Sequence, residues 1–175
     1  MSLSEQLQSR IGDTVVVVGI GNPLRGDDAA GSCVAQRLTR ASARASIIVD
    51  AQEVPESYLG RIVAARPDTV ILVDAVDIGG RPGDSAIIES DQIERYDPTT
   101  HRVPLGLVMR YLRCETGADT FLIGIQPSRV AFGLPMSREV EESVVLLAGL
   151  LERTLAAKVV PDVARAIGHE AEAAS

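Results

Sequence analysis

Residues 15–31 read VVVVGIGNPLRGDDAAG, and this stretch determines the fold class. Its beginning belongs to a run of β-branched residues over 14–19, which is typical of a strand buried on both faces of a parallel sheet. Apolar residues at helical spacing follow over 29–43. The stretch therefore predicts a strand, a tight turn and a helix, which is the opening unit of an α/β protein.

The same alternation continues along the chain. Further strands are predicted over 47–50, 69–74, 85–89 and 119–125. Further helices are predicted over 55–65, 104–114 and 137–157. This order indicates a three-layer α/β/α sandwich with a twisted, mostly parallel five-stranded sheet, in which 85–89 is an antiparallel edge strand. We expect a single α/β domain over residues 1–160 and a flexible tail over 161–175.

Composition excludes several classes of protein. The chain has 175 residues and a formal net charge of -7, and it has no basic patch of the kind that nucleic-acid binding requires. It has neither an apolar signal core near the N-terminus nor an apolar run of membrane-spanning length, so we expect a cytoplasmic protein without a membrane partner. Cys33 and Cys114 match no metal-binding or redox spacing and are interpreted as two buried, reduced thiols.

The turn after the first strand resembles a phosphate-binding loop only in part. Gly19 and Gly21 fit the first two positions of a dinucleotide fingerprint, but Leu24 occupies the third. Asp27 and Asp28 stand where the start of the helix would receive a phosphate, and their negative charge disfavours an anion there. One aspartate can cap the helix. We therefore assign Asp27 to the cap or loop anchor and Asp28 to the cleft, with Asn22 tying the turn by side-chain hydrogen bonds.

Two further polar residues belong to the same edge of the predicted sheet. Asp74 ends the strand 69–74, and His101 precedes the helix 104–114. In parallel sheets, ligands bind beyond the carboxyl ends of the strands, where the strand order reverses. Two carboxylates and one imidazole suit a divalent ion such as Ni, Zn, Mn or Co, and three protein ligands leave coordination positions open. Taken singly, Asp74 can also be a satisfied polar strand end, and His101 a solvated loop residue.

The motifs GIGNPLRGDDAAG, ILVDAVD and TTHRVPLG resemble those of the maturation endopeptidases of nickel–iron hydrogenases. TTHRVPL together with GIQPSRVAFGLPMS is most similar to the branch that processes hydrogenase-3-type enzymes. The resemblance extends over residues 14–155. One segment departs from it: where the family commonly has an aspartate and two glycines, this chain has DAQEVPES, with Ala51 and Gln52 in place of the glycines.

The resemblance implies a hydrolase that removes the C-terminal extension from the nickel-loaded precursor of a hydrogenase large subunit. The nickel would come from the substrate, and other divalent metals could occupy the site. The same three residues, Asp28, Asp74 and His101, would contact the metal and carry catalysis in an aspartyl or metal-dependent endopeptidase. The substrate cleft is expected to include Gly21, Asn22, Asp27, Asp50 and Glu56.

Two chemical routes and two other classes of protein stay open on the sequence. The metal could polarise the scissile carbonyl and activate water. Alternatively, nickel is the recognition handle, and a carboxylate such as Asp28 is the general base. A nickel-dependent checkpoint chaperone would bind the precursor without cleaving it, and a general metal-dependent hydrolase would act on small amides or nucleotides.

Overall fold

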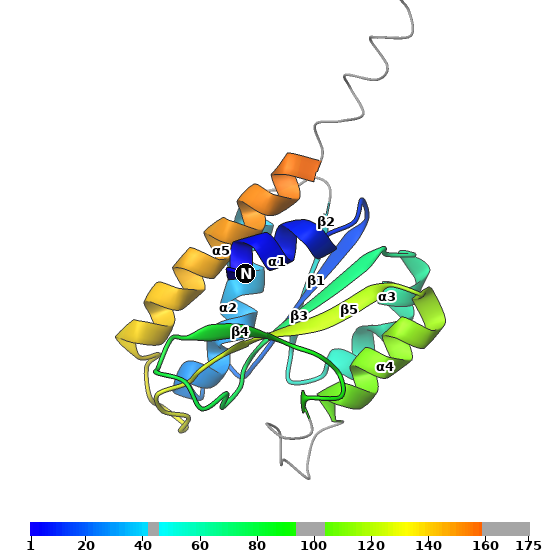
Figure 1. Ribbon diagram of the computed structural model, residues 1–175. Coiled ribbons are helices and arrows are strands. Elements are labelled where there is room, and N and C mark those ends of the chain that lie inside the picture. Colours follow the sequence, from blue (N-terminus) through cyan, green and yellow to red (C-terminus); the bar gives the residue numbers. More distant parts are fainter. Residues whose placement is uncertain (42–45, 94–103, 159–175) are drawn as a thin grey trace, which may run out of the picture.

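The computed structural model describes residues 1–41, 46–93 and 104–158, which form one five-stranded sheet covered by helices (Figure 1). The strand order is β2-β1-β3-β5-β4. The strands are β1 (Val15–Ile20), β2 (Ser46–Gln52), β3 (Thr69–Ala75), β4 (Ser85–Ile88) and β5 (Asp119–Ile125). All neighbouring pairs are parallel except β4 with β5, which is antiparallel. The predicted fold class, including its antiparallel edge strand, is confirmed.

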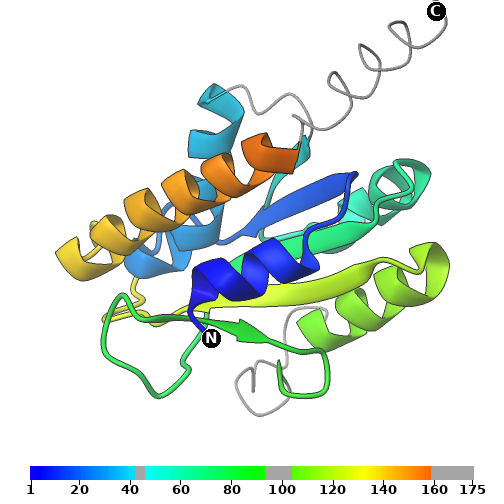
Figure 2. The same ribbon diagram turned by 45° about the horizontal axis from the view of Figure 1, so that its top comes forward.

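Helices cover both faces of the sheet (Figure 2). The helices are α1 (Leu3–Arg10), α2 (Ala30–Arg40), α3 (Leu59–Ala64), α4 (Leu105–Thr116) and α5 (Arg138–Lys158), with short 3-10 segments η1 (Gly26–Ala29) and η2 (Pro55–Tyr58). One apolar cluster joins the sheet to α1, α2 and α5, and a second joins it to α3 and α4. The predicted second helix is thus divided into η2 and α3.

The two clusters follow from the alternation of side chains along the strands. In β1, Val15 and Val17 belong to the α1/α2/α5 cluster, whereas Val16 and Val18 belong to the α3/α4 cluster. Every residue of β1 is buried. This explains why a strand with helices on both sides reads as a continuous apolar run.

Helix α1 was not predicted from the sequence. It is stabilised by a capping box, in which the side chains of Ser2 and Glu5 each accept a hydrogen bond from the other residue's backbone N–H. Its apolar stripe consists of Leu3 and Leu7, continued by Ile11 just after the helix, and this short signal in an otherwise polar segment was overlooked. Arg10 ends the helix, pairs with Asp119 and Glu89, and lies over the ring of Phe121 at 4.1 Å.

The interpretation of both cysteines as buried is wrong for Cys114 and holds only in part for Cys33. Cys33 is partly buried in α2, but Cys114 is exposed on α4. Both are free thiols, and burial raises the pKa of the Cys33 thiol. Within the described parts of the chain, no helix is long and apolar enough to span a membrane. The predicted tail over 161–175 lies outside the described residues.

Candidate active site

The strand order reverses at β1. The chain runs from β1 outward to β2, and then crosses back to β3 on the other side of β1. Asp28 lies in η1, directly after β1, and Asp74 is the penultimate residue of β3. Both aspartates therefore come from the carboxyl edge of the sheet at its topological switch point, where open α/β sheets bind ligands.

Glycines let the start of α2 press against the two strand ends. A Cβ atom added to Gly31 would lie 1.9 Å from the carbonyl oxygen of Val73 and 2.4 Å from that of Ile20. A Cβ atom on Gly21, which has φ +143, would lie 1.9 Å from the carbonyl oxygen of Asp28. The close approach of backbone at Gly21 and Gly31 thus holds the Asp28 segment against the ends of β1 and β3.

The two aspartates of this edge differ from ordinary surface carboxylates. Asp74 is only 7% exposed, and its Oδ1 accepts a hydrogen bond of 2.8 Å from the backbone N–H of Ala75. Asp28 is half-buried. Carboxylate oxygens are ligands of divalent cations, so two aspartates at one edge of the sheet make this edge suited to a positively charged ligand.

Asp27 has a different role from its neighbour. Its side chain is 0% exposed, and Oδ2 accepts hydrogen bonds from the backbone N–H groups of Ser128 (2.8 Å) and Arg129 (2.9 Å). The backbone N–H and the hydroxyl of Ser137 donate to the same carboxylate at 2.6 and 2.9 Å. Burial alone raises the pKa of Asp27, but these four donors outweigh it and hold the pKa below its ordinary value. Asp27 is the loop anchor that the sequence predicts, and it ties the turn to the loop between β5 and α5.

Asn22 fixes the turn after β1 by side-chain hydrogen bonds, as predicted. Asn22 Oδ1 accepts a hydrogen bond of 2.8 Å from the backbone N–H of Leu24, and its Nδ2 donates one of 2.8 Å to Glu53. The backbone N–H of Gly21 donates to the carbonyl oxygen of Gln52 at 2.9 Å. The first turn is therefore attached to the end of β2.

The remaining cleft candidates stand beside this turn. Asp50 accepts hydrogen bonds from Ser32 Oγ (2.7 Å) and Gln36 Nε2 (2.9 Å), both on α2. Glu56 is exposed in η2. These contacts make Asp50 a link between β2 and α2, and the roles of both residues toward a substrate stay predictions.

Gln52, which stands where the family pattern has a glycine, has an unusual backbone conformation. Gln52 has φ +48, in the left-handed region that favours glycine, and β2 shifts register against β1 just there. A glycine at this position would adopt the turn without steric strain, which explains the glycine expected from the resemblance. In this chain the strained turn places a long amide side chain, exposed to solvent, at the edge that bears the site.

Gln126 is a site-shaping residue that sequence reasoning missed. Its Oε1 accepts hydrogen bonds from the backbone N–H groups of Ile78 (2.8 Å) and Gly80 (3.1 Å), and its Nε2 donates to Asp77 at 3.1 Å. It therefore fixes the loop that follows Asp74. The available signal was a glutamine directly after the apolar run FLIGI, in the segment GIQPS.

His101 lies outside the described residues. Over the described residues, no group of three or more His, Cys, Asp or Glu side chains is arranged to hold a metal ion. The structure thus brings two of the three predicted ligands, Asp28 and Asp74, to one edge, and the third stays a prediction.

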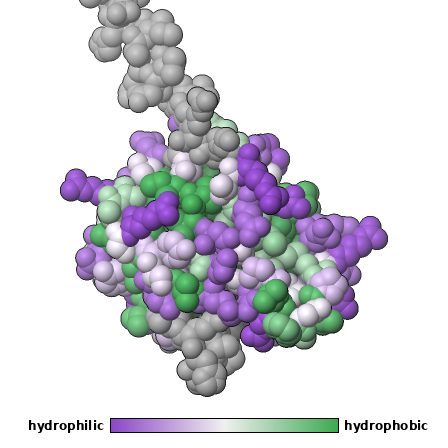
Figure 3. Space-filling model, turned by 180° about the vertical axis from the view of Figure 1, so that it is seen from behind, coloured by the Kyte–Doolittle hydropathy of each residue, from purple (hydrophilic) through white to green (hydrophobic). Residues whose placement is uncertain are grey.

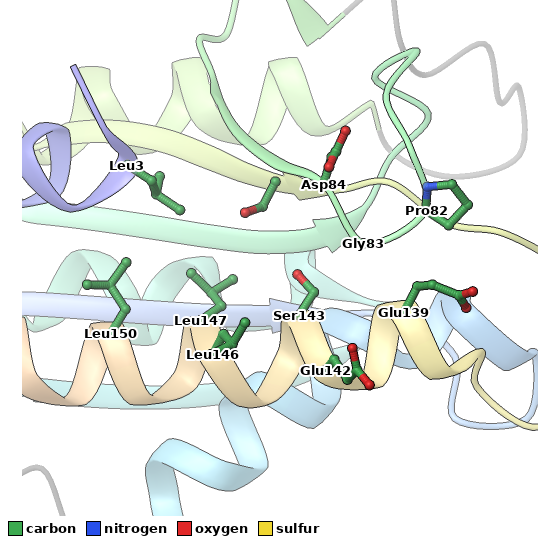
Figure 4. Close-up of a pocket in the computed structure, with 11 residues that line it drawn as sticks. Leu3, Pro82, Gly83, Asp84, Glu139, Glu142, Ser143, Leu146, Leu147 and Leu150 are labelled. Atoms are coloured by element: carbon green, nitrogen blue, oxygen red, sulfur yellow. The ribbon is translucent and has the colours of Figure 1, made fainter.

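A groove of about 400 Å³ lies on the face of the sheet that α1, α2 and α5 cover, between α5 and the start of the edge strand β4 (Figure 4). Leu146, Leu147 and Leu150 of α5 line it together with Leu3, while Asp84 and Glu139 stand at its opposite end. It contains none of the predicted site residues.

Comparisons with known proteins agree on one family. Residues 33–154 match the family described as hydrogenase maturation protease. The hydrogenase 3 maturation protease of Escherichia coli K12 is 36% identical over 132 residues, which cover 75% of this chain and 84% of that protein. A putative hydrogenase maturation protease of Methanocaldococcus jannaschii is 31% identical over 137 residues, which cover 74% of this chain and 80% of that protein.

Solved structures extend the similarity to the fold. The crystal structure of the NiFe hydrogenase maturation protease HycI from Thermococcus kodakarensis superimposes with a TM-score of 0.80 at 37% identity. That match covers 88% of this chain and 99% of the other. The chain is therefore an α/β protein whose candidate site lies at the switch point of a mostly parallel sheet. The chain belongs to the hydrogenase maturation protease family and is a peptidase, as the sequence predicts.

Proposed function

We propose that the protein removes the C-terminal extension from the nickel-loaded large-subunit precursor of a nickel–iron hydrogenase. The observation that carries this proposal is the placement of Asp28 and Asp74 at one switch point, held there by the packing of Gly31 against Val73. Membership of the family and the similarity to hydrogenase 3 maturation proteases support the choice of substrate. We place the reaction in the cytoplasm, where the free thiols of Cys33 and Cys114 are expected to stay reduced.

We propose His101 as the third ligand of the substrate's nickel. Helix α4 ends at Thr116, three residues before β5 begins at Asp119, so it runs back across the sheet and begins toward the carboxyl edge. His101 precedes the first residue of α4 by only four positions. Two carboxylates and an imidazole fit a borderline divalent ion, and they leave coordination positions for the ligands that the precursor supplies.

The chemistry proposed for the site is hydrolysis of one peptide bond. Water adds to the scissile carbonyl carbon, the C–N bond breaks, and the proton passes to the departing amine. Asp28, which is half-buried and follows a rigid turn, is placed to accept the proton from water. Asp74, with one carboxylate oxygen engaged by the N–H of Ala75, is suited to orient the nickel rather than to take up a proton.

The test is a set of single substitutions assayed on purified, nickel-loaded precursor by intact-mass spectrometry. Asp28→Asn, Asp74→Asn and His101→Ala are each expected to slow removal of the extension by at least about 100-fold, because each removes a charge or ligand at the reacting centre. Glu152→Gln, at an exposed position of α5, is the matched control and should retain the wild-type rate. Circular dichroism confirms that each variant is folded.

Normal processing by any two of the three site variants would contradict the assignment of the site. Cleavage of a nickel-free precursor at the full rate would contradict recognition through nickel. If the wild-type protein binds the nickel-loaded precursor and the mass of the precursor stays unchanged, the protein is a checkpoint chaperone. If unrelated peptides are cleaved equally well, it is a general hydrolase.

A further inference from the structure

Four large apolar side chains are exposed on two adjacent loops at the carboxyl edge of the sheet. Leu24 lies in the turn after β1, and the others lie in the loop between β5 and α5. We call this surface the apolar rim; its members are Leu24, Val130, Phe132 and Leu134. Phe132 is 77% exposed and Leu24 61%. The yellow β5–α5 loop is at the lower left of Figure 1, and the half-turn to Figure 3 brings that side to the right, where hydrophobic atoms gather at the lower right of the molecule.

The two loops of the apolar rim are bonded to each other. The backbone N–H of Gly133 donates to the carbonyl oxygen of Leu24 at 2.8 Å. Gly26, with φ +63, packs so closely that an added Cβ atom would lie 3.2 Å from the carbonyl oxygen of Arg129 and 3.4 Å from that of Pro135. The buried Asp27 carboxylate holds the start and the end of the same loop. The rim is therefore a fixed surface, and its exposed side chains are displayed by rigid backbone.

Two arginines flank the apolar rim. Arg25 follows Leu24 and Arg129 precedes Val130, and both are exposed. Neither forms an ion pair with any residue in the described ranges. In a chain of net charge -7, this local positive charge beside apolar side chains complements a partner surface that is apolar and acidic.

The position of the rim links it to the site. Leu24 and Asp28 belong to the same turn, and the carbonyl oxygen of Asp28 accepts a hydrogen bond from the backbone N–H of Asn22 within it. A segment seated on Leu24 and Phe132 would therefore lie next to Asp28. Exposed aromatic and aliphatic side chains on a rigid frame are typical anchors of a protein interface.

We propose that the apolar rim is the docking surface for the hydrogenase precursor, and that it takes a segment of the precursor with large apolar side chains beside an acidic one. This inference rests on the proposed function. In it, the rim supplies affinity for the precursor protein, whereas Asp28, Asp74 and His101 act on its metal and its peptide bond.

The experiment measures binding of nickel-loaded precursor in an Asp74→Asn background, which keeps the precursor uncut. Phe132→Ser and Leu24→Ser should each weaken binding at least tenfold. Leu146→Ser, on α5 and 72% exposed, is the matched control and should change the dissociation constant less than twofold. With Asp74 restored, Phe132→Ser should raise KM and leave kcat at saturating precursor unchanged. Arg129→Glu should weaken binding and reduce its dependence on salt, because an attractive charge pair is removed.

Three results would overturn the docking inference while leaving the proposed function intact. The first is unchanged binding in the rim variants with normal cleavage. The second is an equal loss in Leu146→Ser. The third is a dimer of the protein that Phe132→Ser dissociates, which would make the rim a contact between copies. Absence of both binding and cleavage by the wild-type protein would instead contradict the proposed function itself.

Discussion

Asp27 and Asp28 are adjacent in the sequence and have different roles. Asp27 is buried and satisfied by four donors, whereas Asp28 is half-buried at the edge of the sheet. A helix start needs one acceptor, so the doubling of the aspartate indicated that one of them serves another purpose. The anchor role of Asp27 was thus predictable in kind, but its partners, about a hundred residues further along the chain, were not.

Asp27→Asn is expected to destabilise the protein by about 2–4 kcal/mol at neutral pH. The NH2 group of the buried amide is a donor, so at least one of the N–H groups that now bond to the carboxylate would lose its acceptor. The pKa of Asp27 is lowered in the folded state from an ordinary value of 3.8. The stabilisation by the carboxylate is therefore complete above about pH 4 and is lost as the pH falls through the folded-state pKa. Urea unfolding from pH 3 to pH 8 measures this.

The difference in free energy of unfolding between the wild type and Asp27→Asn should be constant from pH 5 to pH 8 and should shrink below about pH 4. Asp91→Asn, at an exposed position, is the control and should show a difference close to zero at neutral pH. A difference that grows on acidification would contradict the assignment of Asp27 as a charged anchor.

At the scale of elements, local sequence predicts most of the secondary structure. The strands and the long helices agree within a few residues, because each combines an apolar run or stripe with turn residues at its ends. Helix α1 was missed because its apolar signal, Leu3 and Leu7 followed by Ile11, is short and lies in an otherwise polar segment. Contacts between distant segments, such as those of Gln126 with the loop after β3, cannot be derived from local pattern.

Gly31→Ala tests how closely α2 must approach the sheet. The added methyl group would meet the backbone oxygen of Val73 at 1.9 Å, so α2 must shift and the protein should lose about 3 kcal/mol or more. Gly60→Ala in α3 is the matched control, since nothing lies within 4 Å of its Cβ position. It should be neutral or stabilising by up to about 1 kcal/mol. Chemical denaturation of both variants compares them.

If Gly31→Ala is as stable as Gly60→Ala, the approach of α2 to β3 is looser than described. The placement of Asp28 beside the end of β3 would then lose its structural basis. A loss of cleavage in Gly31→Ala that exceeds the loss of stability would instead show that the active site depends on this approach.

At the scale of the whole molecule, one sheet separates two apolar clusters. Every inner strand contributes to both, because successive side chains point to opposite faces. The clusters are therefore expected to unfold together. The chain has no tryptophan, and the two described tyrosines, Tyr58 and Tyr111, lie on the α3/α4 side of the sheet.

Leu7→Ala removes a fully buried side chain on the opposite side, in the cluster of α1, α2 and α5. It should cost about 2–5 kcal/mol and lower the urea midpoint of tyrosine fluorescence as much as that of circular dichroism. A shift seen by circular dichroism alone would mean that the two faces unfold separately. Leu146→Ser, which is exposed on α5, should move neither midpoint by much.

The β5–α5 loop is held at both ends, and this limits how its sequence can vary among related proteins. Gln126 secures the chain just before the loop, and the Asp27 carboxylate grips Ser128 and Arg129 at its start and Ser137 at its end. Between these fixed points, the exposed side chains of Val130, Phe132 and Leu134 can change without disturbing the core, while Gly133, with φ +77, and the length of the span are constrained. We therefore expect related proteins to differ in this loop by substitutions that alter which partner it binds, and rarely by insertions.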